Sequence, residues 1–306
     1  MTALRRAAVA LAAAALLAAG ARADDAQLTR GRAVLEASGG CTCHTDFKGG
    51  GASLAGGRPL KTPFGVFYST NITPDPETGI GKWSDADFAR AMREGISPTG
   101  SSYFPVFPYT SFTGMSDDDV AALKAYLFTL PPVRRANTPH AAWPPFRWRI
   151  AAAAWRWMNF TPARFTPDAA RTPEWNRGAY LVSAVAHCGE CHTPRKLDGS
   201  LDRSRWLAGS TDGPEGALAP NLTPDKDTGI GLWTRTDMVW FLQTGSLPDG
   251  DETEGLMHEV IEHGYEHVPE ADLQAIAVYL ASLPPVRNDA LAEREREQEQ
   301  EQEQSP

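Results

Sequence analysis

Two segments of the chain, 119–133 and 272–286, place apolar residues on one helical face. The apolar positions follow one another at intervals of three or four residues, which is the period of an amphipathic helix. They are Val120, Leu123, Leu127 and Leu130 in the first segment and Leu273, Ile276, Leu280 and Leu283 in the second. Each segment ends in Leu-Pro-Pro-Val, so the pattern predicts two helices that stop at the prolines.

Capping signals predict two further helices. Ser84 and Asp87 have the spacing of a capping box, and the helix that they open is expected to end at Gly95. Thr234 and Asp237 repeat that spacing later in the chain. Signals for strands are sparse, so we expect an all-α fold.

The chain contains two copies of one unit. The stretches 28–38 and 176–186 each predict a short helix that leads into a pair of cysteines. The block NITPDPETGIGKW (71–83) recurs as NLTPDKDTGIGLW (221–233), and the helices that end in Leu-Pro-Pro-Val follow in the same order. We therefore predict a tandem duplication.

The segment 135–175 joins the two predicted units, 24–134 and 176–288. Aromatic residues at this density are seldom left in water, so we expect a linker that packs against both units. The aromatic residues are Trp143, Phe146, Trp148, Trp155, Trp157, Phe160, Phe165 and Trp175. The alternative is an interfacial membrane helix over 146–160, which would give peripheral membrane association. The acidic, glutamine-rich end, 289–306, is expected to be disordered.

Residues 1–23 have the pattern of a secretory signal peptide, with two arginines before an apolar run and small residues at the cleavage site. We therefore expect a periplasmic protein, in a compartment where paired cysteines are normally oxidised. The formal net charge of −9 argues against broad contact with phosphates, so no nucleic-acid partner is expected.

Cys188, Cys191 and His192 form a C-x-x-C-H motif, which is the attachment pattern of c-type haem. Two thiols on one helical turn can add to the two vinyl groups of a porphyrin, and the adjacent histidine can bind the iron. A disulfide, a zinc knuckle and a thioredoxin-type pair are the alternatives. Zinc would need two further ligands at comparable spacing, and a thioredoxin-type pair would need a preceding strand, where we expect a helix.

Cys41, Cys43 and His44 form a shortened copy, C-x-C-H. The distance along the chain from the preceding Arg-Gly pair is the same in both copies, so the missing residue lies inside the motif. Cys43 and His44 keep the adjacency that sets the iron ligand. We therefore expect a second covalently bound haem c, attached at least through Cys43; the alternative is a haem-free site.

Each haem needs a sixth ligand, and methionine would raise the potential and close the iron to small molecules. Met257, in a predicted loop before the last helix, is the predicted ligand in the second unit, because Met238 lies on an amphipathic helix where core packing accounts for it. Three histidines compete with it: His258, His263 and His267. In the first unit we prefer Met115 to Met92 for the same reason.

The chain resembles the periplasmic multihaem class I cytochromes c that accept electrons in quinoprotein alcohol dehydrogenases and related molybdenum-dependent dehydrogenases. The resemblance covers nearly all of 28–286, and its strongest motifs are 177–195, 103–120 and the two repeated Asn-x-Thr-Pro-Asp blocks. It implies two all-helical cytochrome c domains, a dehydrogenase as electron donor, and a terminal oxidase or another cytochrome as acceptor. Family members often carry three such units, whereas this chain has two.

Electron transfer without substrate chemistry is therefore the expected function. A dihaem peroxidase or thiosulfate-oxidising enzyme is the rival, and it would need an open distal position beside an acid–base group such as His263 or His267. Met257 as a sixth ligand would close that position. A haem-based sensor is a third class, but the sequence shows no output module. The acidic chain is expected to dock on a basic patch of its partner, with an affinity that falls as salt rises.

Overall fold

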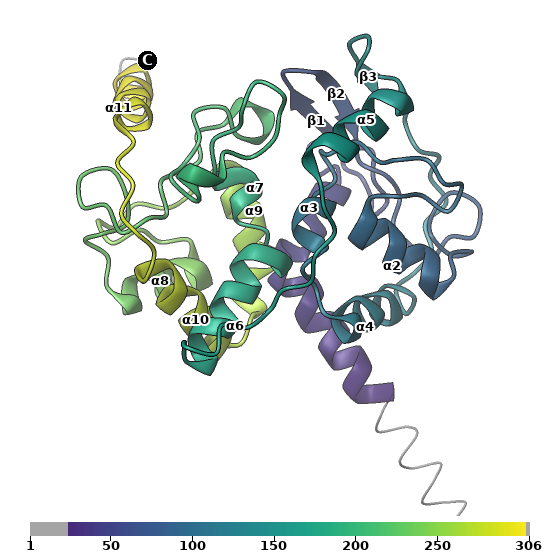
Figure 1. Cartoon of the computed structure of the whole chain (residues 1–306), viewed down its shortest axis with the longest axis horizontal. Coiled ribbons are helices and arrows are strands. Elements are labelled where there is room, and N and C mark those ends of the chain that lie inside the picture. The colour runs from purple at the N-terminus through teal and green to yellow at the C-terminus, as the bar shows by residue number, and fades with distance from the viewer. Residues whose placement is uncertain (1–23, 304–306) are drawn as a thin grey trace, which may run out of the picture.

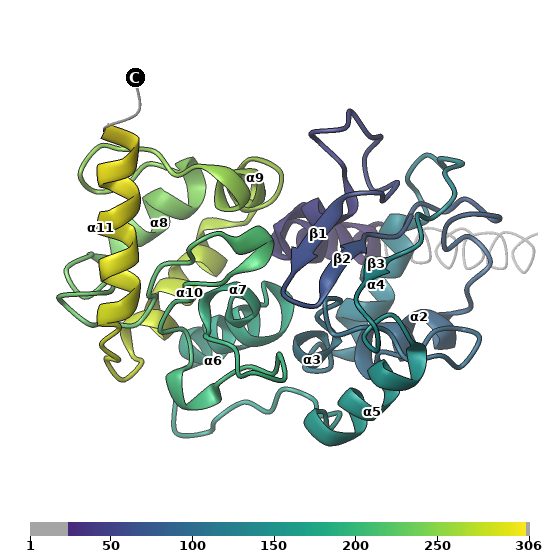
Figure 2. The same ribbon diagram turned by 90° about the horizontal axis from the view of Figure 1, so that it is seen from above.

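The computed structural model describes residues 24–303, which form two lobes that lie side by side (Figures 1 and 2). The first lobe contains a helix over 24–37, η1 (Gly39–His44), α2 (Asp85–Glu94), α3 (Tyr109–Phe112), α4 (Asp117–Leu127) and α5 (Arg149–Asn159). The second lobe contains α6 (Pro173–Tyr180), η2 (Leu181–Val185), α7 (Gly189–His192), η3 (Arg203–Arg205), η4 (Pro214–Gly216), α8 (Arg235–Thr244), α9 (Gly255–Glu262), η5 (Tyr265–His267), α10 (Glu270–Ala281) and α11 (Asp289–Glu303). The predicted signal peptide, 1–23, lies outside the described residues.

In each lobe the N-terminal helix crosses the C-terminal helix at a glycine. A Cβ atom on Gly31 would lie 2.0 Å from the carbonyl oxygen of Ala122 in α4. A Cβ atom on Gly178 in α6 would lie 1.9 Å from the carbonyl oxygen of Ala275 in α10. Only glycine lets the helices approach this closely, and the helices of both crossings contribute to one apolar core that extends through the two lobes.

The predicted helices are present, and their caps are the predicted ones. α4 and α10 end before the two Pro-Pro pairs. α2 begins after Ser84, whose hydroxyl accepts a hydrogen bond from the Asp87 amide, and ends at Gly95 in the left-handed conformation. α8 repeats this capping box with Thr234 and Asp237. The helix before the second cysteine pair continues from α6 into the π-helical turn η2.

A small antiparallel sheet departs from the expected all-α fold. β1 (Pro59–Thr62) pairs with β2 (Gly65–Tyr68), and β2 pairs with β3 (Ala141–Ala142). The strands are too short to show an alternating pattern, and β3 comes from a distant part of the sequence, so periodicity could not reveal the sheet. The described chain is mainly helical with this one addition.

The segment between the predicted units lies mostly on the first lobe. β3 joins its sheet, and Ala152 of α5 belongs to the same small apolar core as Phe67 of β2. Trp155 contacts the second lobe, where its Nε1 donates to the carbonyl oxygen of Asp198 at 2.7 Å. The expectation that the aromatic residues of this segment are buried is wrong for four of them, because Trp143, Phe146, Trp148 and Trp157 are exposed.

The C-terminal segment is helical where the sequence predicts disorder. α11 extends outward from the second lobe (Figure 1). Its first turn is anchored, because Leu291 is fully buried and Asn288 Nδ2 donates to the carbonyl oxygen of Ala208 at 2.7 Å. Glu, Gln and Arg favour helices, so an anchored first turn can propagate without an apolar stripe.

Among the helices of residues 24–303, none combines the length and the apolar character that a membrane crossing requires.

Candidate functional site

The second cysteine motif lies on one tight turn of the second lobe. The chain turns at His187, whose φ of 43° is left-handed, and then enters α7, which ends at His192. A Cβ atom on Gly189 would lie 2.1 Å from the ring of Trp206. Close packing against Trp206 therefore requires glycine directly after Cys188.

His192 is oriented by a backbone carbonyl. Its Nδ1 lies 2.8 Å from the carbonyl oxygen of Pro220. Because a carbonyl only accepts hydrogen bonds, Nδ1 carries the hydrogen and Nε2 keeps its lone pair. Burial lowers the pKa of His192, which favours this neutral form. A fixed ring that presents a basic Nε2 has the properties of an iron ligand.

His44 has the same orientation, although its motif is one residue shorter. Its Nδ1 lies 2.7 Å from the carbonyl oxygen of Thr70, and burial lowers its pKa as well. The shorter turn closes because Gly40 and Cys41 both adopt a left-handed backbone, with φ of 64° and 52°. This conformation costs a non-glycine residue about 1–2 kcal/mol, so Cys41 holds local strain.

The four cysteines are thiols that favour the protonated form. Burial raises the pKa of Cys41 and of Cys188 to about 11. Burial in the first place, and then the nearby Cys43, raise the pKa of Cys191 to about 12. Since Cys43 and Cys191 belong to different motifs, the two motifs lie close enough to interact electrostatically.

The backbone hydrogen bonds around His44 and around His192 are alike. The amide of Gly56 donates to the carbonyl oxygen of His44 at 2.7 Å, and the amide of Gly209 donates to that of His192 at 2.8 Å. Other matched hydrogen bonds run from Leu54 N to Thr45 Oγ1, from Leu207 N to Thr193 Oγ1, and from the side-chain amides of Asn71 and Asn221 to the carbonyls of Val133 and Val286. The surroundings of both motifs are therefore built alike.

The two predicted methionine ligands lie in different surroundings. Met115 is buried in the core just before α4. Met257 is half-buried on α9, a helix where the sequence predicts a loop. Met92 and Met238 are buried on α2 and α8, in keeping with a packing role. Iron ligation by Met115 and Met257 stays a prediction.

The first motif packs directly against α9, the helix that carries Met257. A Cβ atom on Gly40 would lie 2.2 Å from the carbonyl oxygen of His263, so only glycine fits at this contact. The ring of His263 also stacks on Phe47, with the ring centroids 4.5 Å apart. The shortened turn of the first unit thus lies beside the predicted distal segment of the second.

A buried arginine that the sequence analysis missed links the lobes near the first motif. Arg58 lies next to β1, and its Nε is 3.2 Å from a carboxylate oxygen of Glu215. The same guanidinium pairs with Glu259 on α9. These partners are 157 and 201 positions away in the sequence, so no local pattern could indicate the contact.

A buried carboxylate inside the second motif forms another link. Glu190 accepts hydrogen bonds from Thr110 at 2.8 Å and Ser111 at 2.7 Å, both in α3 of the first lobe, and pairs with Arg195 at 2.9 Å. Burial alone would raise the pKa of Glu190, but Arg195 and the two hydroxyls outweigh burial and lower it. The sequence shows an acidic residue between the cysteines but gives no sign of its partners.

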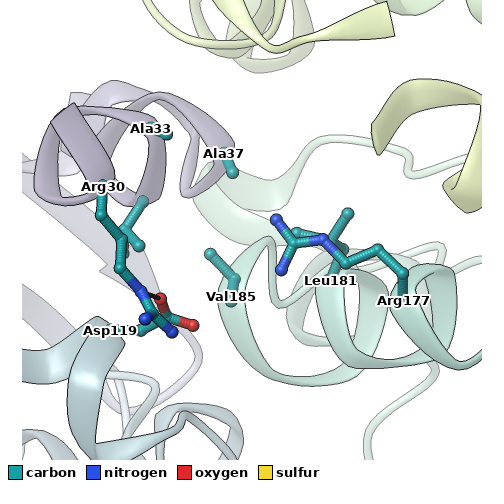
Figure 3. A pocket seen from close by; sticks show the side chains of 8 residues that line it. Arg30, Ala33, Ala37, Asp119, Arg177, Leu181 and Val185 are labelled. Atoms are coloured by element: carbon teal, nitrogen blue, oxygen red, sulfur yellow. Dashed lines mark hydrogen bonds and ion pairs between the residues drawn. The ribbon is translucent and has the colours of Figure 1, made fainter. Parts of the chain in front are cut away.

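A cavity of about 180 Å³ lies between the N-terminal helices of the two lobes (Figure 3). Its apolar lining is Ala33, Val34, Ala37, Leu181 and Val185. The two arginines at its edge are already engaged, Arg30 with Asp119 and Arg177 with Asp272. Small-molecule sites usually enclose about 300–1,000 Å³, so this cavity is a packing feature of the lobe interface.

Two cysteines followed at once by a carbonyl-fixed histidine define the attachment site of a c-type cytochrome. The chain is 42% identical over 264 residues to a dihaem c-type cytochrome of Cereibacter sphaeroides, a match that covers 85% of this chain and 87% of that protein. No family model matches the chain. At this identity and coverage the chain belongs to the family of dihaem c-type cytochromes.

Two further relatives are parts of dehydrogenases. The chain is 43% identical to a subunit of the nicotinate dehydrogenase of Pseudomonas putida, over 84% of this chain and 21% of that protein. It is 40% identical to the cytochrome c subunit of the quinone alcohol dehydrogenase of Gluconobacter oxydans, over 86% of this chain and 56% of that subunit. The chain therefore spans only part of the length of these two relatives.

Proposed function

We propose that this protein is a periplasmic dihaem cytochrome c that relays single electrons from a dehydrogenase to the respiratory chain. The observation that carries the proposal is the shared geometry of His44 and His192, each held through Nδ1 by a carbonyl and each next to a cysteine motif. The matched helix crossings and hydrogen bonds support a tandem of two class I cytochrome c domains.

In the second domain, Cys188 and Cys191 would hold haem c covalently and His192 would bind its iron through Nε2. The bound group supplies the exchange of one electron between Fe(II) and Fe(III). The Pro220 carbonyl fixes the ring of His192 in one orientation, and Met257 is the proposed sixth ligand. Trp206 packs against Gly189, and Cys188 borders the apolar core, so the surroundings of the turn are apolar and would tune the potential of the bound group.

In the first domain, Cys43 and His44 would take the same roles. Cys41 reaches the turn in a left-handed conformation, so its thiol is a second attachment point only if the strained turn permits the bond. Met115 is the proposed sixth ligand, and it is buried as a closed haem site requires.

The proposed donor is a dehydrogenase, because several relatives are named as cytochrome subunits of such enzymes, among them gluconate 2-dehydrogenase of Pantoea cypripedii and fructose dehydrogenase of Gluconobacter japonicus. A terminal oxidase or a second cytochrome is the proposed acceptor. The net charge of −9 supports docking on a basic partner surface. The pattern of residues 1–23 supports export to the periplasm.

The rival role as a dihaem peroxidase has less support. His263 stacks on Phe47, and His267 lies beside Glu266, with its Nε2 3.3 Å from the carboxylate. Neither contact marks these histidines as acid–base groups beside an open iron. The relatives are named as a dihaem c-type cytochrome and as a cytochrome c subunit of a dehydrogenase, which also favours the relay.

The intact mass of the exported protein, with a pyridine haemochrome spectrum of the same sample, tests the proposal. We expect the mass of the mature chain plus two haem groups. Cys43→Ala is expected to remove one group, whereas Cys41→Ala is expected to retain it, because Cys43 keeps the adjacency to His44. A mass with one haem, unchanged in Cys43→Ala, would confine the chemistry to the second domain and overturn the relay.

A further inference from the structure

α5 presents its apolar side to solvent. The exposed positions follow one another at intervals of three, one, three and one residues, which is one continuous face of a helix. They are Ile150, Ala153, Ala154, Trp157 and Met158, all apolar. Ile150 is 78% exposed and Trp157 is 84% exposed. A surface helix normally turns such a face toward the core, whereas α5 turns it toward solvent.

The opposite side of α5 is fixed to the protein by polar groups. Arg156 donates to the carbonyl oxygen of Glu94, and Arg149 donates to the carbonyl oxygen of Ser102 at 3.1 Å. Trp155 is held by Asp198, and Ala152 is buried. The helix therefore cannot turn its apolar face inward without losing these contacts.

Three aromatic residues just before α5 extend the exposed face. Trp143 is 66% exposed, and Phe146 and Trp148 are also exposed. We call these three residues and the five exposed residues of α5 the α5 surface. α5 lies at the edge of the molecule, on a different side from α8 and α11 (Figure 2). An exposed apolar area of this kind marks an interaction site.

The segment that carries the α5 surface has charged residues of one sign. Residues 136–167 contain no aspartate or glutamate, but they contain four arginines. The arginines are Arg147, Arg149, Arg156 and Arg164. Arg147 is exposed and has no ion-pair partner in the described part of the chain. Arg164 pairs with Asp117, so the positive charge beside the exposed tryptophans comes from Arg147 and from Arg149 and Arg156, which donate to backbone carbonyls.

We propose that the α5 surface docks on an anionic phospholipid membrane. Tryptophans prefer the headgroup level of a bilayer, and arginines at that level pair with lipid phosphates. An amphipathic helix that lies flat in the interface buries an apolar face of this size and keeps its cations at the headgroups. The polar anchors of α5 hold that face outward before docking, so no rearrangement of the fold is needed.

Vesicle binding by the full-length holoprotein tests this inference. The probes are vesicles of phosphatidylcholine alone and of phosphatidylcholine with phosphatidylglycerol, used in co-sedimentation at low and high salt. We expect binding to the anionic vesicles that weakens with salt, and little binding to the neutral ones. The double variant Ile150→Gln/Trp157→Gln is expected to bind about tenfold more weakly or worse, because it removes two large apolar groups from the interface.

Trp240→Gln is the matched control, because Trp240 is 57% exposed on α8 in the other lobe. We expect it to bind vesicles like the unaltered protein, and Arg147→Gln to lose part of the preference for anionic lipid. Brominated acyl chains should quench tryptophan fluorescence, and Trp157→Gln should lose part of that quenching.

Equal vesicle binding by the double variant and the unaltered protein would overturn the inference. So would a loss of self-association or of dehydrogenase binding in the double variant without any loss of vesicle binding, since the surface would then face another protein. The haem spectrum is recorded on every sample. Failure of docking with both haems intact therefore leaves the proposed electron relay standing.

Discussion

The two cysteine motifs have different lengths but hold their histidines alike. In the second lobe a helical turn with glycine at position 189 carries the chain from Cys188 to His192. In the first lobe a turn shorter by one residue reaches His44 through left-handed Gly40 and Cys41. The carbonyl contact and the backbone hydrogen bond to each histidine are the same. The histidine and its hydrogen bonds are therefore the same in both motifs, whereas the length and conformation of the turn differ.

The segments after the motifs differ more. The first lobe leads to Met115 through the short α3, whereas the second lobe has the longer α9 and then η5. The C-terminal end of α9 contacts the first cysteine motif, and α3 contacts Glu190 in the second motif. Each of these segments thus joins the lobes, and this is where the two lobes differ most.

Replacing the histidines is expected to give the largest effect, and it tests most directly whether the two motifs are equivalent. His44→Gln and His192→Gln should each remove the low-spin absorption of one haem and leave that of the other, because a carbonyl fixes each of these rings directly after its cysteines. Absorption spectra of the reduced proteins, recorded for both variants, measure this. A spectrum that is unchanged in His44→Gln would mean that the two sites are not equivalent.

Replacing the glycine at the helix crossing should lower the unfolding free energy by the same amount in both lobes. Gly31→Ala and Gly178→Ala each place a methyl group within about 2 Å of a carbonyl oxygen, and overpacking of this kind costs about 3 kcal/mol or more. Denaturant unfolding of the two variants measures the loss. Gly100→Ala is the control, because Gly100 has a positive φ but open space, so it reports backbone strain alone. A much smaller loss at one crossing would contradict the equivalence of the lobes.

The smallest expected effect on stability concerns Asp119 and Asp272, which pair with Arg30 and Arg177 on the N-terminal helices of the two lobes. Asp119 is buried and accepts hydrogen bonds from Arg30 and from Tyr180 of the second lobe, whereas Asp272 pairs with Arg177 nearer the surface. Burial alone would raise the pKa of Asp119, but these hydrogen bonds outweigh burial and lower it below 3.8. Asp119→Asn should cost about 2 kcal/mol at pH 7 and Asp272→Asn less than about 1 kcal/mol.

The pH dependence of that difference follows from the lowered pKa. The stabilisation by Asp119 is complete above the ordinary aspartate pKa and is lost as the pH falls through the lower pKa of the folded state. The gap in unfolding free energy between the unaltered protein and Asp119→Asn should therefore be constant near neutrality and close below pH 3.8. A gap that widens on acidification would show that Asp119 is not held as a carboxylate.

Local signals in the sequence predicted a large part of the fold. Capping boxes fixed the ends of α2 and α8, and apolar periodicity identified α4 and α10, because both depend on residues within one or two turns. The sheet, the helix α9 and the link from Arg58 to Glu215 were not predicted. They depend on contacts between distant segments, and neither spacing nor composition indicates such pairs.

The candidate site shows the same division. The cysteine motifs and their histidines could be identified because the chemistry requires adjacent residues. The orientation of His192 by Pro220 and the burial of Glu190 against α3 could not, since the partners come from elsewhere in the chain. The exposed tryptophans of the α5 surface were expected to be buried, because composition does not say which side of a segment meets the protein.

The close approach of Gly40 to α9 has a kinetic consequence. The two cysteine turns cannot separate without breaking the contacts of Arg58 and Glu190, so any haem groups held on them would keep one fixed spacing. Electron exchange between them would then be a first-order event whose rate is independent of dilution. Only the first transfer into the chain and the last transfer out of it would depend on collisions with other molecules.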